Sequence, residues 1–356
     1  MEETILKHEE RAVYALRSLY RSYGYGPYKM SRFEEYDLYV RNKDFLVSDQ
    51  IITFSDRSGR LLALKPDVTL SIVKNAPEEP GVVQKVYYDE NVYRDYREIM
   101  QAGLECVGDL GEYEIAEAVL LAAMSLEKLG GRFVLNLSHM GLVAAVLEEL
   151  RPELKKQALS CLGSKNLHGL REICQGYPQV WEKLERLAAC RGRGDQVLYK
   201  LDQVLTGDFE RQALRQLQTV WTILDSAGYG DSVRLDFSVR SNMSYYSGVV
   251  FTGYLDGVPA AVLSGGQYDR LLEKMGRRAK AIGFAIYLDQ LQGLNKSAFD
   301  VDTVILHDGT AQPDALMAAS RLAAQSGSVL VSRTLPTDRR WRRLVRFENG
   351  EAREIE

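Results

Sequence analysis

The stretch that decides the fold is REIMQAGLECVG, which runs from Arg97 to Gly108. Its composition predicts a β-strand, in which successive side chains point to opposite faces of a sheet. The apolar face of this strand is formed by Met100, Ala102, Leu104 and Cys106. The other face carries Gln101, Gly103 and Glu105, which are an amide, a gap and an acid. This second face raises the question of what a sheet holds above it.

Composition places the chain among ordinary globular proteins. It has 356 residues, 46% of them apolar and 26% charged, which is enough for a large core. The N-terminus has no apolar segment typical of a signal peptide, and no apolar run approaches the roughly 20 residues of a membrane span. The four cysteines show no C-x-x-C spacing, as expected of reduced thiols. We therefore expect a cytoplasmic protein without membrane contact.

Charge and histidine content argue against two kinds of site. The balance of 45 basic and 49 acidic residues disfavours a nucleic-acid binder. The dense basic cluster Arg333–Arg346 is interpreted as a solvated hairpin. The four histidines are scattered along the sequence, so we expect neither a metal site nor a cofactor.

The first third of the chain alternates helical and strand patterns. Apolar spacing predicts a helix from Ile5 to Tyr23, a β-hairpin around the turn Asp56–Gly59, and a helix that begins at Pro66. Two strands are expected between Val82 and Val107, joined by a loop over Asp89–Tyr96. The next elements are predicted to be a helix over Tyr113–Leu129 and a strand over Phe133–Met140.

The rest of the chain divides into three parts. Residues from about 141 to 227 have helical periodicity throughout and predict an all-helical insertion. Strand patterns then return, with helices expected over Tyr268–Met275 and Ala285–Leu291. Residues 299–356 predict a small α/β domain, which leaves residues 1–298 as the main domain. Hairpin connections favour an α+β fold with an antiparallel sheet flanked by helices rather than a Rossmann sheet.

Polar side chains recur in four otherwise apolar stretches: LKPDVT, REIMQAGLE, SYYSGVVF and SGGQYD. The candidate binding residues in them are Asp67, Thr69, Gln101, Glu105, Tyr245, Tyr246 and Tyr268. Two carboxylates, an amide and several phenols can hold a small cationic ligand. The alternative is that internal arginines neutralise Asp67 and Glu105. Because isolated buried polar groups are costly, the set as a whole favours a ligand.

In this order, the stretches resemble the catalytic core of a class II aminoacyl-tRNA synthetase, specifically histidyl-tRNA synthetase. The family's LRPEGT, R-x-F-x-Q-x-G-x-E, RGLDYYTGTVFE, GGGRYDGL and AVGFAIGLERL are similar to LKPDVT, REIMQAGLE, SNMSYYSGVVFTG, SGGQYDRL and AIGFAIYLDQL. The resemblance covers residues from about 5 to 292. It implies a class II synthetase-like antiparallel sheet and a histidine pocket.

Three departures from the synthetase pattern concern its ATP site. The family's motif 2 arginine falls on Tyr87, its adenine-stacking phenylalanine on Ile99, and its motif 3 arginine on Gln290. An arginine donates two parallel charged hydrogen bonds to phosphate, which neither tyrosine nor glutamine can do. The family's arginine before the tyrosine pair falls on Ser241, next to Arg240. The resemblance therefore implies a pocket that keeps an amino acid and has lost adenylate chemistry.

A second family combines these departures with a short C-terminal part. The chain is similar to the regulatory subunits of ATP phosphoribosyltransferase, which resemble histidyl-tRNA synthetase without its aminoacylation activity. This resemblance implies a non-catalytic subunit of histidine biosynthesis that activates a short catalytic subunit and confers feedback inhibition by L-histidine. It implies a homodimer, formed near GYGPYKMSRFEEYDLY, within a hetero-octamer that does not bind tRNA.

The resemblance also implies roles for the candidate residues. Asp67 is expected to pair with the α-ammonium group of histidine, and Glu105 with the tyrosines to recognise the imidazole. Gln101 is expected to bond the amino or the carboxylate group. Two alternatives remain open: an active histidyl-tRNA synthetase or related histidine-activating ligase, and a synthetase-like scaffold without a ligand.

Overall fold

The computed structural model describes residues 8–46, 50–77, 79–190, 192–238, 245–293, 299–348 and 350–355. The chain divides into two compact units, Met1–Gln292 and Gly293–Glu356, and most contacts lie within one unit or the other. The sequence placed this boundary a few residues later, after residue 298. Each unit has its own sheet, and the first contains every candidate binding residue.

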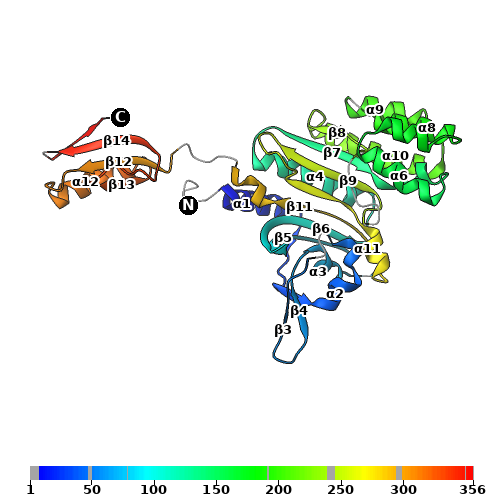
Figure 1. Cartoon of the computed structure of the whole chain (residues 1–356), viewed down its shortest axis with the longest axis horizontal. Helices are drawn as coiled ribbons and strands as arrows, with labels where there is room; N and C mark the ends of the chain where they lie inside the picture. Colours follow the sequence, from blue (N-terminus) through cyan, green and yellow to red (C-terminus); the bar gives the residue numbers. More distant parts are fainter. Residues whose placement is uncertain are drawn as a thin grey trace. The chain divides into compact units, whose positions relative to one another are not determined.

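An eight-stranded sheet forms the centre of the first unit (Figure 1), with the strand order β1-β5-β6-β11-β10-β9-β7-β8. In chain order these strands are β1 Gly26–Pro27, β5 Val83–Arg94, β6 Arg97–Gly108, β7 Phe133–His139, β8 Val233–Leu235, β9 Val249–Leu255, β10 Leu263–Gln267 and β11 Lys280–Tyr287. The six inner strands pair antiparallel, and only the two short edge strands pair parallel. The predicted antiparallel sheet is confirmed.

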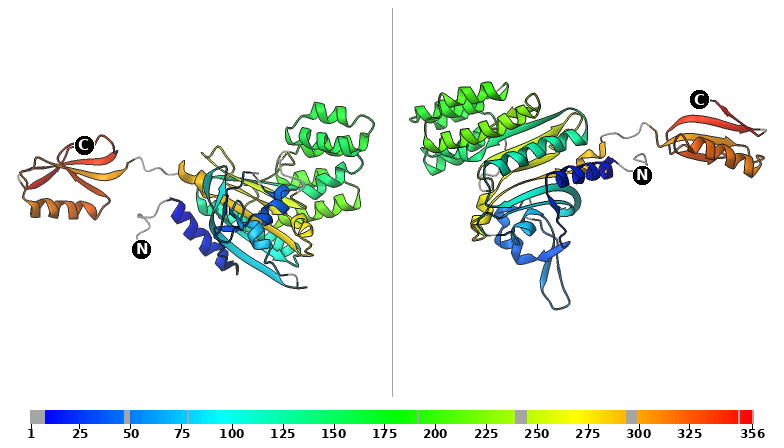
Figure 2. Two further views of the ribbon diagram at one scale, coloured as in Figure 1. Left: turned by 60° about the horizontal axis from the view of Figure 1, so that its bottom comes forward. Right: turned by 180° about the vertical axis from the view of Figure 1, so that it is seen from behind.

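One face of this sheet is packed against the helices α1 (His8–Ser22) and α4 (Glu112–Leu129). The ring of Tyr20 in α1 lies against the rings of Tyr87 and Phe284. The predicted apolar face of β6 points to this side, where Leu104 is fully buried. This face is the main core of the unit. Figure 2 shows α1, in blue, against the sheet from behind.

The opposite face of the sheet carries a group of smaller elements, which includes β4 and α11 (Figure 1). They are the three-stranded sheet β2-β4-β3 with strands Phe33–Glu35, Leu61–Leu64 and Thr53–Ser55, and the short helices α2 Tyr36–Arg41, η1 Lys43–Phe45, α3 Thr69–Val73 and α11 Asp269–Lys274. Their apolar side chains form a second core with residues of β5 and β6. The elements surround the face that carries Gln101 and Glu105.

Three predicted element boundaries are wrong. Strand β5 continues through the expected loop to Arg94, and only Asp95 and Tyr96 form the turn, with φ of 50° and 59°. Such a turn matches the twist of the two strands. The helix expected from Pro66 begins at Thr69. The helix expected over Ala285–Leu291 is the end of β11 followed by the 3-10 helix η2 (Leu288–Gly293), because β11 pairs with β6 up to Tyr287.

The described elements between residues 140 and 227 are all helices, as the sequence predicted for the insertion. Its helices are α5 Met140–Leu147, α6 Pro152–Gly163, α7 Leu167–Ile173, α8 Pro178–Ala188, α9 Gly194–Asp202 and α10 Asp208–Ser226. They gather at the β7–β8 end of the sheet (Figure 1). The last helix, α10, packs against α4 and α5, so the insertion is anchored to the main core.

The second unit is a four-stranded sheet with one helix. Its elements are β12 Val301–His307, α12 Pro313–Ala324, β13 Val329–Ser332, β14 Trp341–Glu348 and β15 Glu351–Glu354, with the strand order β13-β12-β14-β15. The antiparallel strand pair at the end of the unit is β14 with β15. The hairpin expected over Arg333–Arg346 is wrong, because β13 and β14 do not pair with each other but each pair with β12. Within the described parts of both units, none of the helices combines the length and the apolar character that a bilayer span requires.

Candidate functional site

A cavity of about 820 Å³ opens on the sheet face that carries Gln101, Gly103 and Glu105. All seven candidate residues line it: Asp67, Thr69, Gln101, Glu105, Tyr245, Tyr246 and Tyr268. They come from the segment before α3, from α3 itself, from β6, and from the residues just before β9 and α11. The structure therefore brings together four stretches that are far apart in the sequence.

Glu105 is only 2% exposed, as are Gln101 and Tyr268. Its Oε1 accepts a hydrogen bond from the Thr69 hydroxyl at 2.8 Å, and its Oε2 accepts one from the Tyr268 hydroxyl at 2.5 Å. Burial raises the pKa of Glu105 to about 8, although both hydroxyls lower it. Among the described residues no lysine or arginine pairs with this carboxylate. Within the part of the chain that the structure describes, Glu105 thus has hydrogen-bond donors but no counter-charge.

Glycines in the sheet make room for the side chains that form the floor of the cavity. The carboxylate of Glu105 lies so close over Gly283 that a Cβ there would come within 1.6 Å of Oε2. A Cβ on Gly103 would be 2.6 Å from the hydroxyl oxygen of Tyr88. The gap that the sequence showed at Gly103 is therefore filled by a neighbouring tyrosine. Both positions require glycine, because the side chains of Glu105 and Tyr88 lie flat on the sheet directly above them.

Asp67 is held differently from Glu105. Its Oδ1 accepts the backbone N–H of Leu70 at 2.9 Å, and its Oδ2 lies 3.5 Å from the guanidinium of Arg94. Burial raises the pKa of Asp67, while the charge of Arg94 opposes that rise. The alternative interpretation, in which an internal arginine neutralises the carboxylate, therefore applies to Asp67. For Glu105 the described residues supply no such partner.

Gln101 carries a donor that the protein does not use. Its side chain is 2% exposed, and its Nε2 has no hydrogen-bond partner among the described residues. A buried donor without a partner costs about 1–3 kcal/mol. Since Gln101 lines the cavity, a ligand with an acceptor group would remove this cost.

Aromatic rings wall one side of the cavity. Tyr245 lies 4.7 Å from Tyr246, 5.8 Å from Tyr268 and 5.7 Å from Phe45, measured between ring centroids. Such rings suit a flat ligand group of similar size, because edge and stacked contacts add to the burial energy. The site thus combines a buried acid, an unused amide donor and an aromatic wall.

The three positions expected to correspond to the lost ATP site do not line the cavity. Tyr87 points to the opposite face, against Tyr20, because β5 is continuous and alternate side chains face opposite ways. Ile99 packs into the second core, and Gln290 is exposed in η2. Counting back from Gln101 across the expected loop placed Tyr87 on the wrong face.

The carboxylate and basic side chains that the structure describes in the lining are Asp67, Glu105, Asp236 and Arg94, three acids against one base. This balance is unfavourable for a triphosphate. No cluster of histidine, cysteine and acidic side chains within the described ranges is arranged to hold a metal ion. Ser241 and Arg240, which the sequence comparison singled out, lie outside the described residues.

Sequence reasoning missed many further lining residues, among them Tyr88, Arg94 and Tyr287. Tyr88 pairs with Gly103 and Tyr287 with Gln101 across neighbouring strands. Tyr88 would have been found if Asp89–Tyr96 had been read as strand and turn, because the register of a two-residue hairpin follows from its turn. Finding Tyr287 required the pairing of β11 with β6, which the helix expected over Ala285–Leu291 concealed.

Comparisons with known proteins point to histidyl-tRNA synthetases and to the regulatory subunits that are similar to them. The sequence profile of the family described as histidyl-tRNA synthetase matches residues 2–291. An ATP phosphoribosyltransferase regulatory subunit from Moorella thermoacetica is 32% identical over 292 residues, which are 78% of this chain and 75% of that protein.

Two solved structures extend the comparison. An ATP phosphoribosyltransferase regulatory subunit/histidyl-tRNA synthetase from Bacillus halodurans superposes with a TM-score of 0.72 at 24% identity, covering 95% of this chain and 93% of that one. A chain of the ATP phosphoribosyl transferase (HisG:HisZ) complex from Thermotoga maritima superposes with a TM-score of 0.62 at 21% identity, covering 81% and 98%. Both share the class II synthetase-like fold.

Proposed function

Since the chain belongs to the ATP phosphoribosyltransferase regulatory subunits, within the wider histidyl-tRNA synthetase family, we propose that it activates a short catalytic subunit and makes it sensitive to L-histidine. The family's subunits are regulatory rather than catalytic and serve histidine biosynthesis. The observation that carries the histidine part of the proposal is Glu105, a buried carboxylate that no described cation neutralises.

The proposed pose follows from the donors and acceptors that the cavity leaves unused. Glu105 accepts an N–H of the imidazole, whose ring lies against the wall of Tyr245 and Tyr246. Asp67 faces the α-ammonium group, and Gln101 donates from Nε2 to the α-carboxylate. Of the two roles expected for Gln101, its unpaired donor favours the carboxylate, because an ammonium group offers no acceptor.

The proposed partner is the short catalytic subunit of ATP phosphoribosyltransferase. Support comes from the Thermotoga maritima structure, in which a chain similar to this one belongs to a complex named ATP phosphoribosyl transferase (HisG:HisZ). We further propose a homodimer within a cytoplasmic hetero-octamer, as the family resemblance implies. The net charge of −4 supports an assembly that does not bind tRNA.

The cavity supports regulation better than histidine activation. A synthetase must bind ATP beside histidine, and the described lining offers one arginine, already engaged with Asp67 and with the carbonyl of Pro66. Losing one phosphate-binding donor typically costs about 10²–10³ in rate. Histidine-dependent exchange of pyrophosphate into ATP should therefore be absent.

The test is turnover of ATP and phosphoribosyl pyrophosphate by the catalytic subunit, with and without this chain, across a histidine titration. We expect the chain to raise turnover and histidine to suppress it, with a coupling of roughly 5–150-fold. A competent catalytic subunit whose turnover responds to neither addition would contradict the proposal.

A further inference from the structure

The short helix α3 (Thr69–Val73) connects the cavity to the protein surface. Its first turn is tied to both acids of the cavity: Thr69 donates to Glu105, and the Leu70 N–H donates to Asp67. All five of its residues are buried, so it cannot move without its neighbours. A change in either carboxylate therefore acts directly on this helix.

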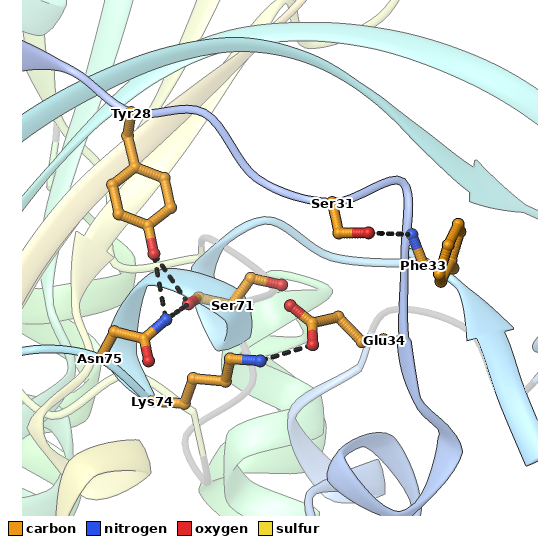
Figure 3. Close-up of polar contacts among 7 residues, drawn as sticks. All are labelled: Tyr28, Ser31, Phe33, Glu34, Ser71, Lys74 and Asn75. Carbon is orange, nitrogen blue, oxygen red and sulfur yellow. Dashed lines mark hydrogen bonds and ion pairs between the residues drawn. The ribbon is translucent and has the colours of Figure 1, made fainter. Parts of the chain in front are cut away.

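The other end of α3 holds a surface segment, which we define as residues 28–35 (Figure 3). The Tyr28 hydroxyl donates to the carbonyl of Ser71 and accepts from the Asn75 amide, both at 3.3 Å. The ammonium group of Lys74 pairs with Glu34 at 2.5 Å. The surface segment ends in β2, where Phe33 is 45% exposed.

Helix α3 also lies beside α2 in the second core. The hydroxyls of Ser71 in α3 and Tyr39 in α2 are buried and have no hydrogen-bond partner among the described residues. They are neighbours, since Ser71 lowers the pKa of Tyr39 against the effect of burial. A shift of α3 would therefore change the contact between these two side chains as well.

We propose that α3 is a positioning element that couples occupancy of the cavity to the surface segment 28–35. A ligand cation beside Glu105 keeps that carboxylate ionised, and a hydrogen bond to an ionised acceptor is roughly twice as strong as a neutral one. The bond from Thr69 then tightens, α3 is held more firmly, and the surface segment becomes more ordered. The proposal rests on the proposed function only in naming L-histidine as the ligand.

Coupling of this kind is reciprocal, so a change at the surface must alter the cavity. Weakening the pair between Lys74 and Glu34 loosens α3 and costs the cavity its ordered donor, Thr69. The variant Glu34→Gln is therefore expected to lower histidine affinity by about fivefold. Residue Glu34 does not line the cavity, so a role limited to local structure would leave the affinity unchanged.

The experiment is hydrogen–deuterium exchange of the full chain, followed by mass spectrometry, with and without L-histidine. The variants are Thr69→Val, Glu34→Gln and the matched control Glu148→Gln, which removes a similar ion pair to Lys155 in the helical insertion. Exchange of backbone N–H groups reports local opening. Calorimetric titration gives the histidine affinity of the same samples.

We expect Thr69→Val to speed exchange in the surface segment by about fivefold even without ligand, with the insertion unchanged. Histidine should slow this exchange in the unaltered chain and in Glu148→Gln, but not in Glu34→Gln. Unchanged exchange in Thr69→Val would overturn the coupling, whatever histidine does. If Thr69→Val unfolds, Glu34→Gln alone decides: affinity equal to that of Glu148→Gln overturns the proposal.

The failure of the proposed function would look different. In that case histidine would bind to no variant, while Thr69→Val would still speed exchange in the surface segment. The coupling would then stand with another ligand, because the response to Thr69→Val needs none.

Discussion

Two buried carboxylates lie on opposite faces of the same sheet, and their surroundings differ in one respect. Glu117 in α4 is 5% exposed and accepts hydrogen bonds from two tyrosine hydroxyls, those of Tyr25 and Tyr113. It also pairs with the ammonium group of Lys85 at 2.6 Å. Glu105 is 2% exposed and has two hydroxyl donors as well, but no cation among the described residues.

The contrast indicates that Glu117 belongs to the core, whereas Glu105 fits the proposed histidine site. A buried charge without a counter-charge is expensive, so a protein either pairs it or leaves it protonated. Glu117 is paired within the chain, whereas Glu105 has its pKa raised to about 8 by burial. The missing partner of Glu105 is what the proposed histidine supplies.

The largest expected effect is on the pH dependence of stability. The pKa of Glu105 is about 8 in the folded chain and near 4.5 unfolded, so folding favours its protonated form. Stability from this group is full below about pH 4.5 and is lost as pH rises to about 8. Each unit of pKa shift corresponds to about 1.4 kcal/mol, so the loss amounts to several kcal/mol. Denaturant unfolding of the ligand-free chain and Glu105→Gln, compared at pH 5 and pH 9, measures it.

The variant Glu105→Gln should be more stable than the unaltered chain at pH 9 and close to it at pH 5. An equal difference at both pH values would mean that Glu105 is paired after all, and the contrast with Glu117 would disappear.

The second effect is the cost of breaking the complete pair. Glu117→Gln leaves Lys85 without its partner and should lower the free energy of unfolding by roughly 3 kcal/mol at pH 7. Thermal or urea unfolding would show it. The opposite signs expected for Glu105→Gln and Glu117→Gln near pH 9 make the two variants controls for each other.

A smaller effect is expected at Gln101, whose unpaired donor has no counterpart near Glu117. Replacing it by Leu removes the buried Nε2 and should raise the stability of the ligand-free chain by about 1–2 kcal/mol. The same change should weaken histidine binding, because the α-carboxylate loses its donor. A variant that is less stable and binds histidine normally would assign Gln101 to the core.

The smallest expected effect is on the number of protons released when histidine binds. If a neutral imidazole donates to an ionised Glu105, binding at pH 7 should release up to about one proton, and the release should vanish near pH 9.5, where the free carboxyl is already ionised. If the carboxyl proton passes to the imidazole instead, binding at pH 7 releases no net proton. Titration calorimetry in two buffers of different ionisation enthalpy detects it. Glu117→Gln should keep the release, since that acid takes no part in binding.

The face of β6 that lines the cavity could be predicted from sequence, because side chains alternate strictly along a strand. Gln101, Gly103 and Glu105 define one face wherever β6 lies in the sheet. The contrast between Glu105 and Glu117 could not be predicted, since it depends on Lys85 and Thr69, which come from other elements. A sequence shows which acids lie in apolar stretches but does not show which of them have a cation nearby.

The misplaced elements have a common physical cause. Polar residues such as Asp89 and Asn91 suggested a loop, yet β5 continues through them because it lies near the edge of the sheet, beside only the two-residue strand β1. The apolar spacing of Ala285–Leu291 suggested a helix, yet pairing with β6 keeps it extended to Tyr287. In both cases tertiary pairing overrides local preference.

The most direct test is a calorimetric titration of L-histidine into the unaltered chain, Glu105→Gln and Glu117→Gln at pH 7. We expect the unaltered chain and Glu117→Gln to bind with similar affinity, and Glu105→Gln to lose binding by about a hundredfold or more. Equal binding by all three would show that histidine does not use this carboxylate. Binding by none would show that the cavity takes a different ligand.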